Sequence, residues 1–122
     1  MKPYALVATG NTTEAKRTRQ ALLHLGFQVE VVTTGARAQV QLAFTTPDLI
    51  ILDMDLPDMP GEVVLRQINA QRRLDTTALI LLSTGMDFPN DMQRRAAATT
   101  IAHPVNPEAL AALAADLAGV NR

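Results

Sequence analysis

The sequence predicts an α/β fold in which a parallel sheet carries helices on both faces. Five short apolar runs alternate with segments of helical spacing, and this alternation is typical of strand–helix–strand units with right-handed crossovers. The central run, residues 49–52, has no polar alternation, which indicates a strand that is covered on both faces. The strands are predicted at residues 4–8, 29–33, 49–52, 78–82 and 100–102.

The first two predicted helices depend on residues that start and stop helices. Asn11 is a suitable cap for the first helix, with Glu14 in the capping-box position, and Gly26 ends it. The second helix follows Gly35 and stops before Pro47, whose ring disfavours a helical predecessor. The inward faces are predicted to carry Ala15, Leu22 and Leu25 in the first helix, and Val40 and Phe44 in the second, which spans about residues 36–44.

The remaining three helices differ in the strength of their signals. The third is predicted at about residues 61–70, and a fourth, at about 91–98, is short and weakly apolar. The fifth opens with Asn106 as its cap, Pro107 in its first turn and Glu108 near the positive end of the helix dipole. The inward faces are predicted to carry Val64, Leu65 and Ile68 in the third helix, and Leu110, Leu113 and Leu117 in the fifth, which runs to about Ala118.

Composition limits the classes of protein that fit the chain. A length of 122 residues with 48% hydrophobic residues fits one domain over residues 1–122. The 11 basic and 12 acidic residues leave a formal net charge of -1, so the chain lacks the positive field that gathers nucleic acid or a membrane surface. The partners are therefore predicted to be proteins or small ligands. The lack of cysteine and of any apolar run near ~20 residues predicts a cytoplasmic location.

The candidate functional residues follow the predicted strands. Ligands of parallel sheets bind where the strands end, and Asp53 directly follows the buried run at 49–52. Ala8 and Thr9, Ser83 and His103 stand at the other strand ends. This set offers few of the carboxylates that a metal-dependent site needs. A structural role, in which Asp53 forms hydrogen bonds with Thr9 and Ser83, fits the same residues.

The chain resembles the receiver domain of two-component response regulators over almost its whole length. The resemblance is carried by Asp53 within residues 52–57, by Gly61 at the start of the third helix, by Ser83 and by Pro104. It implies a flavodoxin-like (βα)5 fold, a doubly wound parallel five-stranded sheet with strand order 2-1-3-4-5. It also implies that Asp53 is the phosphoacceptor position for a histidine kinase, and that Ser83 and His103 occupy the positions that contact the phosphoryl group. The family holds Mg²⁺ with this aspartate, an acidic pair and a backbone carbonyl.

Four positions depart from the family pattern. The acidic pair falls on Ala8 and Thr9, the lysine position is His103, and the aromatic switch position is Thr100. Magnesium prefers oxygen ligation that includes carboxylates, and phosphoryl transfer depends on cations that neutralise the developing charge. Histidine is shorter than lysine and largely neutral at pH 7. The sequence therefore predicts a degenerate receiver domain, not an enzyme and without a cofactor, that serves as an interaction or dimerisation module with little or no phosphorylation.

Two alternatives stay open from the sequence. In one, Asp53 is a working phosphoacceptor and Asp55 replaces the lost acids, which makes Asp53 and Asp55 the candidate ligands for Mg²⁺. In the other, the loop of residues 9–13 binds a small anion at a helix N-terminus. The predicted protein partners are a histidine kinase or a downstream signalling protein, and a second copy that pairs through the fourth helix, the fifth strand and the alanine-rich fifth helix. Both a single-domain protein and a piece of a longer regulator fit the sequence.

Overall fold

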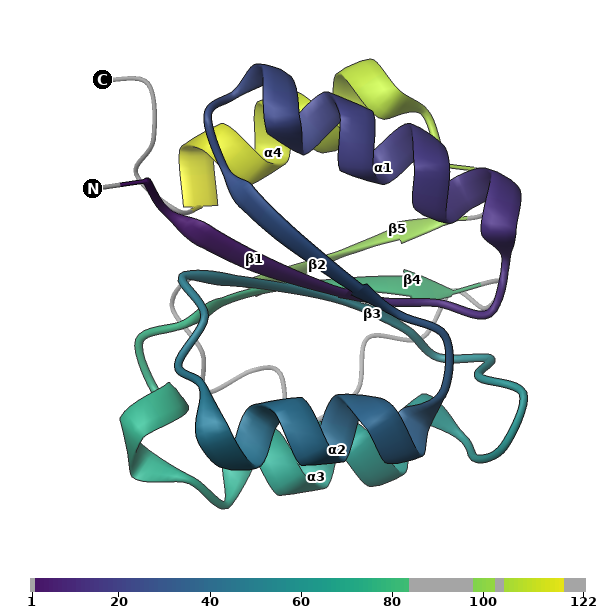
Figure 1. Ribbon diagram of the computed structural model, residues 1–122, viewed down its shortest axis with the longest axis vertical. Helices are drawn as coiled ribbons and strands as arrows, with labels where there is room; N and C mark the ends of the chain where they lie inside the picture. The colour runs from purple at the N-terminus through teal and green to yellow at the C-terminus, as the bar shows by residue number, and fades with distance from the viewer. Residues whose placement is uncertain (1, 84–97, 103–104, 118–122) are drawn as a thin grey trace.

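Five parallel strands form the central sheet, in the order β2-β1-β3-β4-β5 (Figure 1). The computed structural model describes residues 2–83, 98–102 and 105–117. The strand order confirms the predicted flavodoxin-like sheet. The strands are β1 (Tyr4–Ala8), β2 (Gln28–Val32), β3 (Leu49–Asp53), β4 (Ala78–Ser83) and β5 (Ala98–Ala102).

Helices cover both faces of this sheet. α1 (Thr12–His24) and α4 (Pro107–Leu117) lie on one face, and α2 (Gly35–Phe44) and α3 (Gly61–Asn69) lie on the other (Figure 1). A short 3-10 turn, Arg72–Leu74, follows α3. The helix predicted as the fifth is α4. None of the helices in the described part of the chain is long and apolar enough to cross a membrane.

The helix predicted between the fourth and fifth strands needs one correction. Most of the predicted segment, residues 91–98, lies outside the described residues. Its last residue, Ala98, is described, and it begins β5 and pairs with Leu79 of β4 instead of ending a helix. The fifth strand therefore starts two residues earlier than its apolar run indicated, because Thr99 and its neighbours extend the pairing with β4. Alanine has no strong preference for strands, so pairing with the neighbour decides its conformation.

The hydrophobic core has two halves, one on each side of the sheet. Alternate residues of β3 contribute to opposite halves: Ile50 and Leu52 pack toward α2 and α3, and Leu49 and Ile51 pack toward α1 and α4. All four side chains are at most 1% exposed. This two-sided burial explains why the central run lacks polar alternation, since each face of a parallel sheet needs apolar side chains.

Local capping chemistry sets the starts of two helices as predicted. The side chain of Asn11 accepts a hydrogen bond from the backbone N–H of Glu14 at 2.9 Å. The side chain of Asn106 accepts from the N–H groups of Glu108 and Ala109 at 2.9 and 3.2 Å. Gly26 follows α1 with a φ of 91°, a left-handed conformation that glycine adopts at low cost.

The prediction for the inward face of α2 is wrong. Val40 is 60% exposed and Phe44 is 83% exposed, whereas the buried positions are Gly35, Ala38 and Leu42. Ala38 and Leu42 are four residues apart and share one side of the helix, and Val40 lies on another side. The small residues let α2 approach the sheet and the loop after β3 closely. A Cβ at Gly35, for example, would lie 2.5 Å from the Sδ of Met59.

Gly61 places the start of α3 directly against the end of β3. A Cβ at this position would lie 2.6 Å from the Cα of Met54 and 2.7 Å from the backbone oxygen of Asp53. Both of these are backbone atoms, which cannot move aside as a flexible side chain can. Glycine therefore allows the close approach that holds the backbone of Asp53 in place. The predicted inward residues of α3, Val64, Leu65 and Ile68, are all buried.

Candidate functional site

The carboxyl ends of the strands bring the predicted site residues to one edge of the sheet. β1 and β3 pair with Ala8 opposite Leu52, so the residues that follow, Thr9 and Asp53, are neighbours. Leu82 of β4 pairs with Asp53, and Ser83 follows Leu82. The Ser83 side chain is half-buried. The order of the strands therefore places three of the predicted positions side by side.

The Thr9 hydroxyl and the backbone N–H of Asp55 donate hydrogen bonds to the carboxylate of Asp53. Its side chain is 3% exposed, and its Oδ2 accepts a hydrogen bond from the Thr9 hydroxyl at 2.8 Å. Its Oδ1 accepts from the backbone N–H of Asp55 at 2.9 Å. The Thr9 hydroxyl, itself fully buried, also accepts from the N–H of Asn11 at 3.1 Å. These bonds satisfy a buried charge that would otherwise be costly, and they confirm the predicted contact between Asp53 and Thr9.

The other predicted site residues have different surroundings. Asp55 contacts Asp53 through its backbone, and the Asp55 side chain is exposed. His103 lies outside the described residues, and Ala102, which precedes it, pairs with Ser83. Thr100, the aromatic switch position of the resemblance, is half-buried in β5. The described residues thus place Thr9, and not a second carboxylate, against Asp53.

The donor set near Asp53 does not match what Mg²⁺ prefers. Magnesium ligands are oxygen lone pairs, usually with one or two carboxylates among them. The positions that the resemblance assigns to the acidic pair carry the methyl group of Ala8, which is 1% exposed, and the Thr9 hydroxyl, which donates to Asp53. Among the residues that the structure describes, no group of three or more His, Cys, Asp or Glu side chains is arranged to hold a metal ion.

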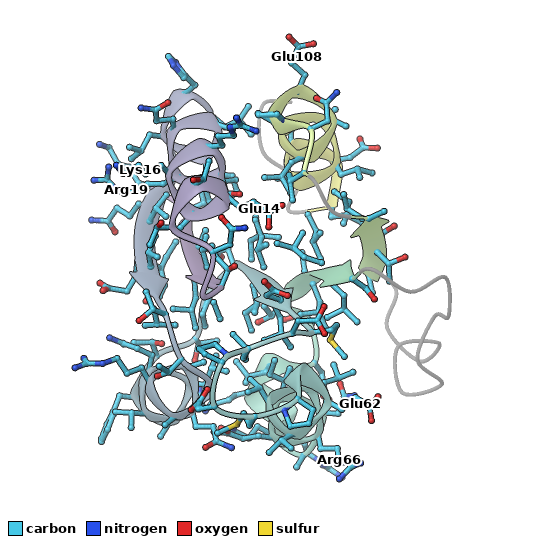
Figure 2. All side chains as sticks on the ribbon, turned by 90° about the vertical axis from the view of Figure 1, so that its right-hand side faces the viewer. Glu14, Lys16, Arg19, Glu62, Arg66 and Glu108 are labelled. Atoms are coloured by element: carbon cyan, nitrogen blue, oxygen red, sulfur yellow. The ribbon has the colours of Figure 1, made fainter. Side chains whose placement is uncertain are left out.

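Glu14 is a buried carboxylate that the sequence placed in the wrong role. In a capping box the Glu14 side chain would accept from the N–H of Asn11, but that N–H donates to Thr9. Glu14 is 5% exposed, and its Oε2 accepts from the N–H of Val105 at 2.9 Å. Figure 2 shows Glu14 on the side of α1 that faces α4, whereas Lys16 lies on the opposite side. Glu14 therefore ties the first turn of α1 to the segment that follows β5.

A sequence signal for this buried carboxylate exists in hindsight. Glu14, Thr18 and Leu22 are spaced four residues apart and are all buried. Two polar residues that share a stripe with a core leucine lie on the inward face of a helix, where polar groups need partners. The hydroxyl of Thr18 is fully buried and has no hydrogen-bond partner within the described residues.

The loop of residues 9–13 uses its polar groups within the chain. The N–H of Asn11 donates to Thr9, and the N–H of Glu14 donates to Asn11. The carboxylate of Glu14 also brings a negative charge to this first helical turn. A helix N-terminus attracts anions through free N–H groups and through its positive dipole end. Here, hydrogen bonds within the chain occupy two of the N–H groups, and the carboxylate of Glu14 offsets part of the dipole.

Asp58 connects the loop after β3 to the start of α2. Its two carboxylate oxygens accept from the N–H groups of Gly35 and Ala36 at 2.8 and 3.0 Å. The Thr34 hydroxyl caps the same helix by accepting from the backbone N–H of Arg37 at 3.2 Å. The hydrogen bond from Gly35, and next the one from Ala36, lower the pKa of Asp58 below its ordinary value. The loop that follows Asp53 is therefore anchored to a helix 22 residues away in sequence.

This anchor predicts an acid-sensitive contribution to stability. Because the pKa of Asp58 is lower in the folded chain than its ordinary value of 3.8, the contribution is complete above pH 3.8 and is lost as the pH falls through the lowered value. Below pH 4, we expect Asp58→Asn to differ less from the wild-type chain in its free energy of unfolding than at pH 7. Denaturant unfolding at a series of pH values measures this, with the exposed Asp75→Asn as control. A gap between Asp58→Asn and wild type that stays constant down to low pH would contradict the assignment.

Comparison with known proteins identifies the family. The family model described as response regulator receiver domain matches residues 6–115. The regulatory protein LuxO of Vibrio vulnificus is 44% identical over 52 residues, which are 43% of this chain and 12% of that relative, so the chain matches a small part of the relative's length.

Two solved structures agree with this match over nearly the whole chain. The signal receiver domain of a putative LuxO repressor protein from Vibrio parahaemolyticus has a TM-score of 0.85 and 28% identity, and the match covers 98% of this chain and 92% of that one. The receiver domain of a signal transduction histidine kinase from Syntrophus aciditrophicus has a TM-score of 0.77 and 33% identity, with coverage of 98% and 93%. The carboxyl-edge aspartate, the strand order and these matches lead to one conclusion: the chain belongs to the response regulator receiver domain family.

Proposed function

We propose that this receiver domain acts as a protein-binding module of a signalling pathway, and that it does so without magnesium-dependent phosphorylation of Asp53. The hydrogen bond from the Thr9 hydroxyl to Asp53 carries the proposal. On this proposal the domain catalyses no reaction and needs no resident cofactor. The cytoplasmic location predicted from the sequence belongs to the same proposal.

The electrostatics of the carboxylate support the proposal. A phosphoryl group would add about one to two negative charges to a side chain that is 3% exposed. Phosphoryl transfer depends on cations that neutralise such charge. Within residues 2–83, 98–102 and 105–117, the Thr9 hydroxyl and the backbone N–H of Asp55 donate to Asp53, and both of these groups are uncharged. Such donors suit a carboxylate that is not phosphorylated.

The exposed face of α1 supports a protein partner. The exposed Lys and Arg side chains of this helix are Lys16, Arg17 and Arg19, and all three are basic. The acidic residue of the helix, Glu14, is buried. A surface of one sign attracts a surface of the other sign and speeds the encounter. The partner, a histidine kinase or a downstream signalling protein, would therefore present an acidic surface, and its binding would weaken as salt is added.

Pairing through β5 and the last helix is a second predicted mode of contact. Ala109 and Ala112 of α4 are exposed and leave a small, uncharged surface. Ala114 is fully buried against the sheet with Leu110, so it takes no part in that surface. Most of the predicted fourth helix, which belongs to the same mode, lies outside the described residues.

An amide NMR titration with magnesium and beryllofluoride tests the proposal. We expect no localised shifts at Thr9, Asp53 and Asp55, and no phosphoryl adduct by intact mass after incubation with a small phosphodonor. The matched control is Asp53→Asn, which removes the acceptor carboxylate and preserves the shape of the side chain. A magnesium-dependent adduct that disappears in Asp53→Asn would replace this proposal with the alternative, a working phosphoacceptor.

A further inference from the structure

Two hydrophobic side chains of α2 lie in solvent, one helical turn apart. Phe44 is 83% exposed and Val40 is 60% exposed, and both are more exposed than the other large hydrophobic residues that the structure describes. With Arg37 and Gln41 they form a stripe at the spacing i, i+3, i+4, i+7 along one side of the helix. We call these four residues the α2 stripe. An exposed apolar patch of this kind is typical of a contact surface.

The stripe borders a groove beside the edge of the sheet. The groove has a volume of about 650 Å³ and is lined by Arg37, Val40 and Gln41 of the stripe, and by residues 30–33 at the end of β2. β2 is the first strand of the order β2-β1-β3-β4-β5, so no described strand pairs with its outer edge. The groove therefore lies between the α2 stripe and an open strand edge.

The backbone of β2 offers hydrogen bonds at this edge. Gln28 donates to Pro3, and Val32 accepts from Thr9, so residues 28 and 32 bond toward β1. Backbone groups alternate along a strand, which turns those of Val29 and Val31 toward the outer edge. An open strand edge is a template for another strand, and native proteins usually block such edges with charges or proline. β2 has one charge, Glu30, and no proline.

The charges of this surface complement one another. α2 carries one charged residue, Arg37, and β2 carries one charged residue, Glu30. Low charge at the centre is a property of protein interfaces. An interface around a two-fold axis must be complementary to itself, and a surface with one acid and one base at different places meets this condition.

We propose that this surface, the outer edge of β2 together with the α2 stripe, binds a second copy of the same chain around a two-fold axis. The two β2 strands pair antiparallel and extend the sheet across the dimer. An axis at Val31 places Glu30 opposite the partner's Val32, whereas an axis at Glu30 would bring two like charges together, which is destabilising. The stripes of the two α2 helices then meet on one face of the sheet.

The antiparallel arrangement brings the opposite charges together. Arg37 lies in the first turn of α2, beside Thr33 at the carboxyl end of β2, and Glu30 lies in the middle of that strand. Because the partner runs in the opposite direction, each Glu30 approaches the partner's Arg37. Phe44, at the far end of the stripe, reaches the start of the partner's helix, where its ring can pack against Val40 and the other residues that line the partner's groove.

This inference rests on the proposed function, because it names a surface for the binding module. The two proposals nevertheless have separate tests. A magnesium-dependent adduct at Asp53 would remove the proposed function and leave the dimer surface in place. A chain that stays monomeric would remove the dimer surface and leave the basic face of α1 as the binding face.

Sedimentation velocity from micromolar to millimolar concentration of the full chain tests the surface. We expect the wild-type chain to dimerise, and Phe44→Glu to weaken the dimer by roughly tenfold or more. Leu23→Glu is the matched control, because Leu23 is also an exposed hydrophobic residue, 43% exposed, but lies on α1. Arg37→Glu alone should weaken the dimer, and Glu30→Arg combined with Arg37→Glu should restore it.

Three results would overturn the proposal. The first is a wild-type chain that stays monomeric at millimolar concentration. The second is a dimer that Leu23→Glu weakens as much as Phe44→Glu does. The third is a dimer that persists in Phe44→Glu and dissociates in Ala112→Glu, which would assign the contact to the exposed alanine face of α4. Circular dichroism of each variant confirms that the change is in association and not in folding.

Discussion

Replacing Ala8 and Thr9 together by aspartate is expected to destabilise the chain strongly in metal-free buffer and to make its stability depend on magnesium. The Thr9 hydroxyl donates to Asp53 at 2.8 Å, and a carboxylate in its place would repel Asp53 instead. Ala8 and Thr9 are at most 1% exposed, so both new charges would start out buried. A buried charge without a partner costs about 3–5 kcal/mol. Two hard oxygen ligands beside Asp53 would in return create the ligand set that magnesium prefers.

Urea unfolding of this double variant in graded magnesium measures both effects. Saturating magnesium at about a hundredfold excess over its dissociation constant would return about 2.7 kcal/mol. Thr9→Ser serves as the control that keeps the hydroxyl, and it should show neither the loss nor the magnesium dependence. Adding Asp53→Asn to the double variant should remove the response to magnesium. A double variant as stable as the wild type in metal-free buffer would mean that Thr9 does not hold Asp53 as the structure indicates.

Glu14→Ala is expected to lower the free energy of unfolding and to loosen the segment after β5. The N–H of Val105 donates to Glu14 at 2.9 Å, and Val105 is 3% exposed. Removing the carboxylate takes away the acceptor that the structure shows for the N–H of Val105. This loss lowers the free energy of unfolding by about 1–3 kcal/mol. The change also leaves a space in the interior between α1 and α4, which adds to the loss.

Hydrogen exchange at the amide of Val105 separates this local effect from a general loss of stability. We expect faster exchange there in Glu14→Ala, and a smaller change in Glu14→Gln, which keeps an oxygen acceptor. Glu108→Ala is the matched control, because Glu108 is an exposed glutamate in the first turn of the other helix on this face. Exchange at Val105 that is the same in Glu14→Ala and the wild type would show that another group holds this N–H.

Features that depend on near neighbours in sequence were predicted well. The unbroken apolar run of β3 led to a parallel sheet covered on both faces, and its last residue, Asp53, marked the site. The caps Asn11 and Asn106 bond to N–H groups two or three residues away. A side chain and a backbone group so close together in sequence form such a bond whatever the rest of the fold does, so the local pattern suffices.

Contacts between distant segments were predicted poorly, for a geometric reason. Glu14 bonds to a residue 91 positions away, and Asp58 caps a helix that starts 23 positions before it. The sequence shows that each carboxylate exists but not which N–H the fold brings to it. The error at Val40 and Phe44 has a related cause. Their large hydrophobic side chains led to the prediction that they lie in the core. In the structure, the side of α2 that packs against the sheet carries the smaller Ala38 instead.

The sequence by itself determined the sheet, the order of its elements along the chain and the position of Asp53, because periodicity and capping are local properties of the chain. The resemblance added the strand order, and it led to the prediction that Thr9 stands where the family has an acid. Only the tertiary structure decided how the buried carboxylate is satisfied, with the Thr9 hydroxyl at 2.8 Å, and which face of α2 remains in solvent. Both outcomes depend on which surfaces pack together, and packing is set by the whole fold at once.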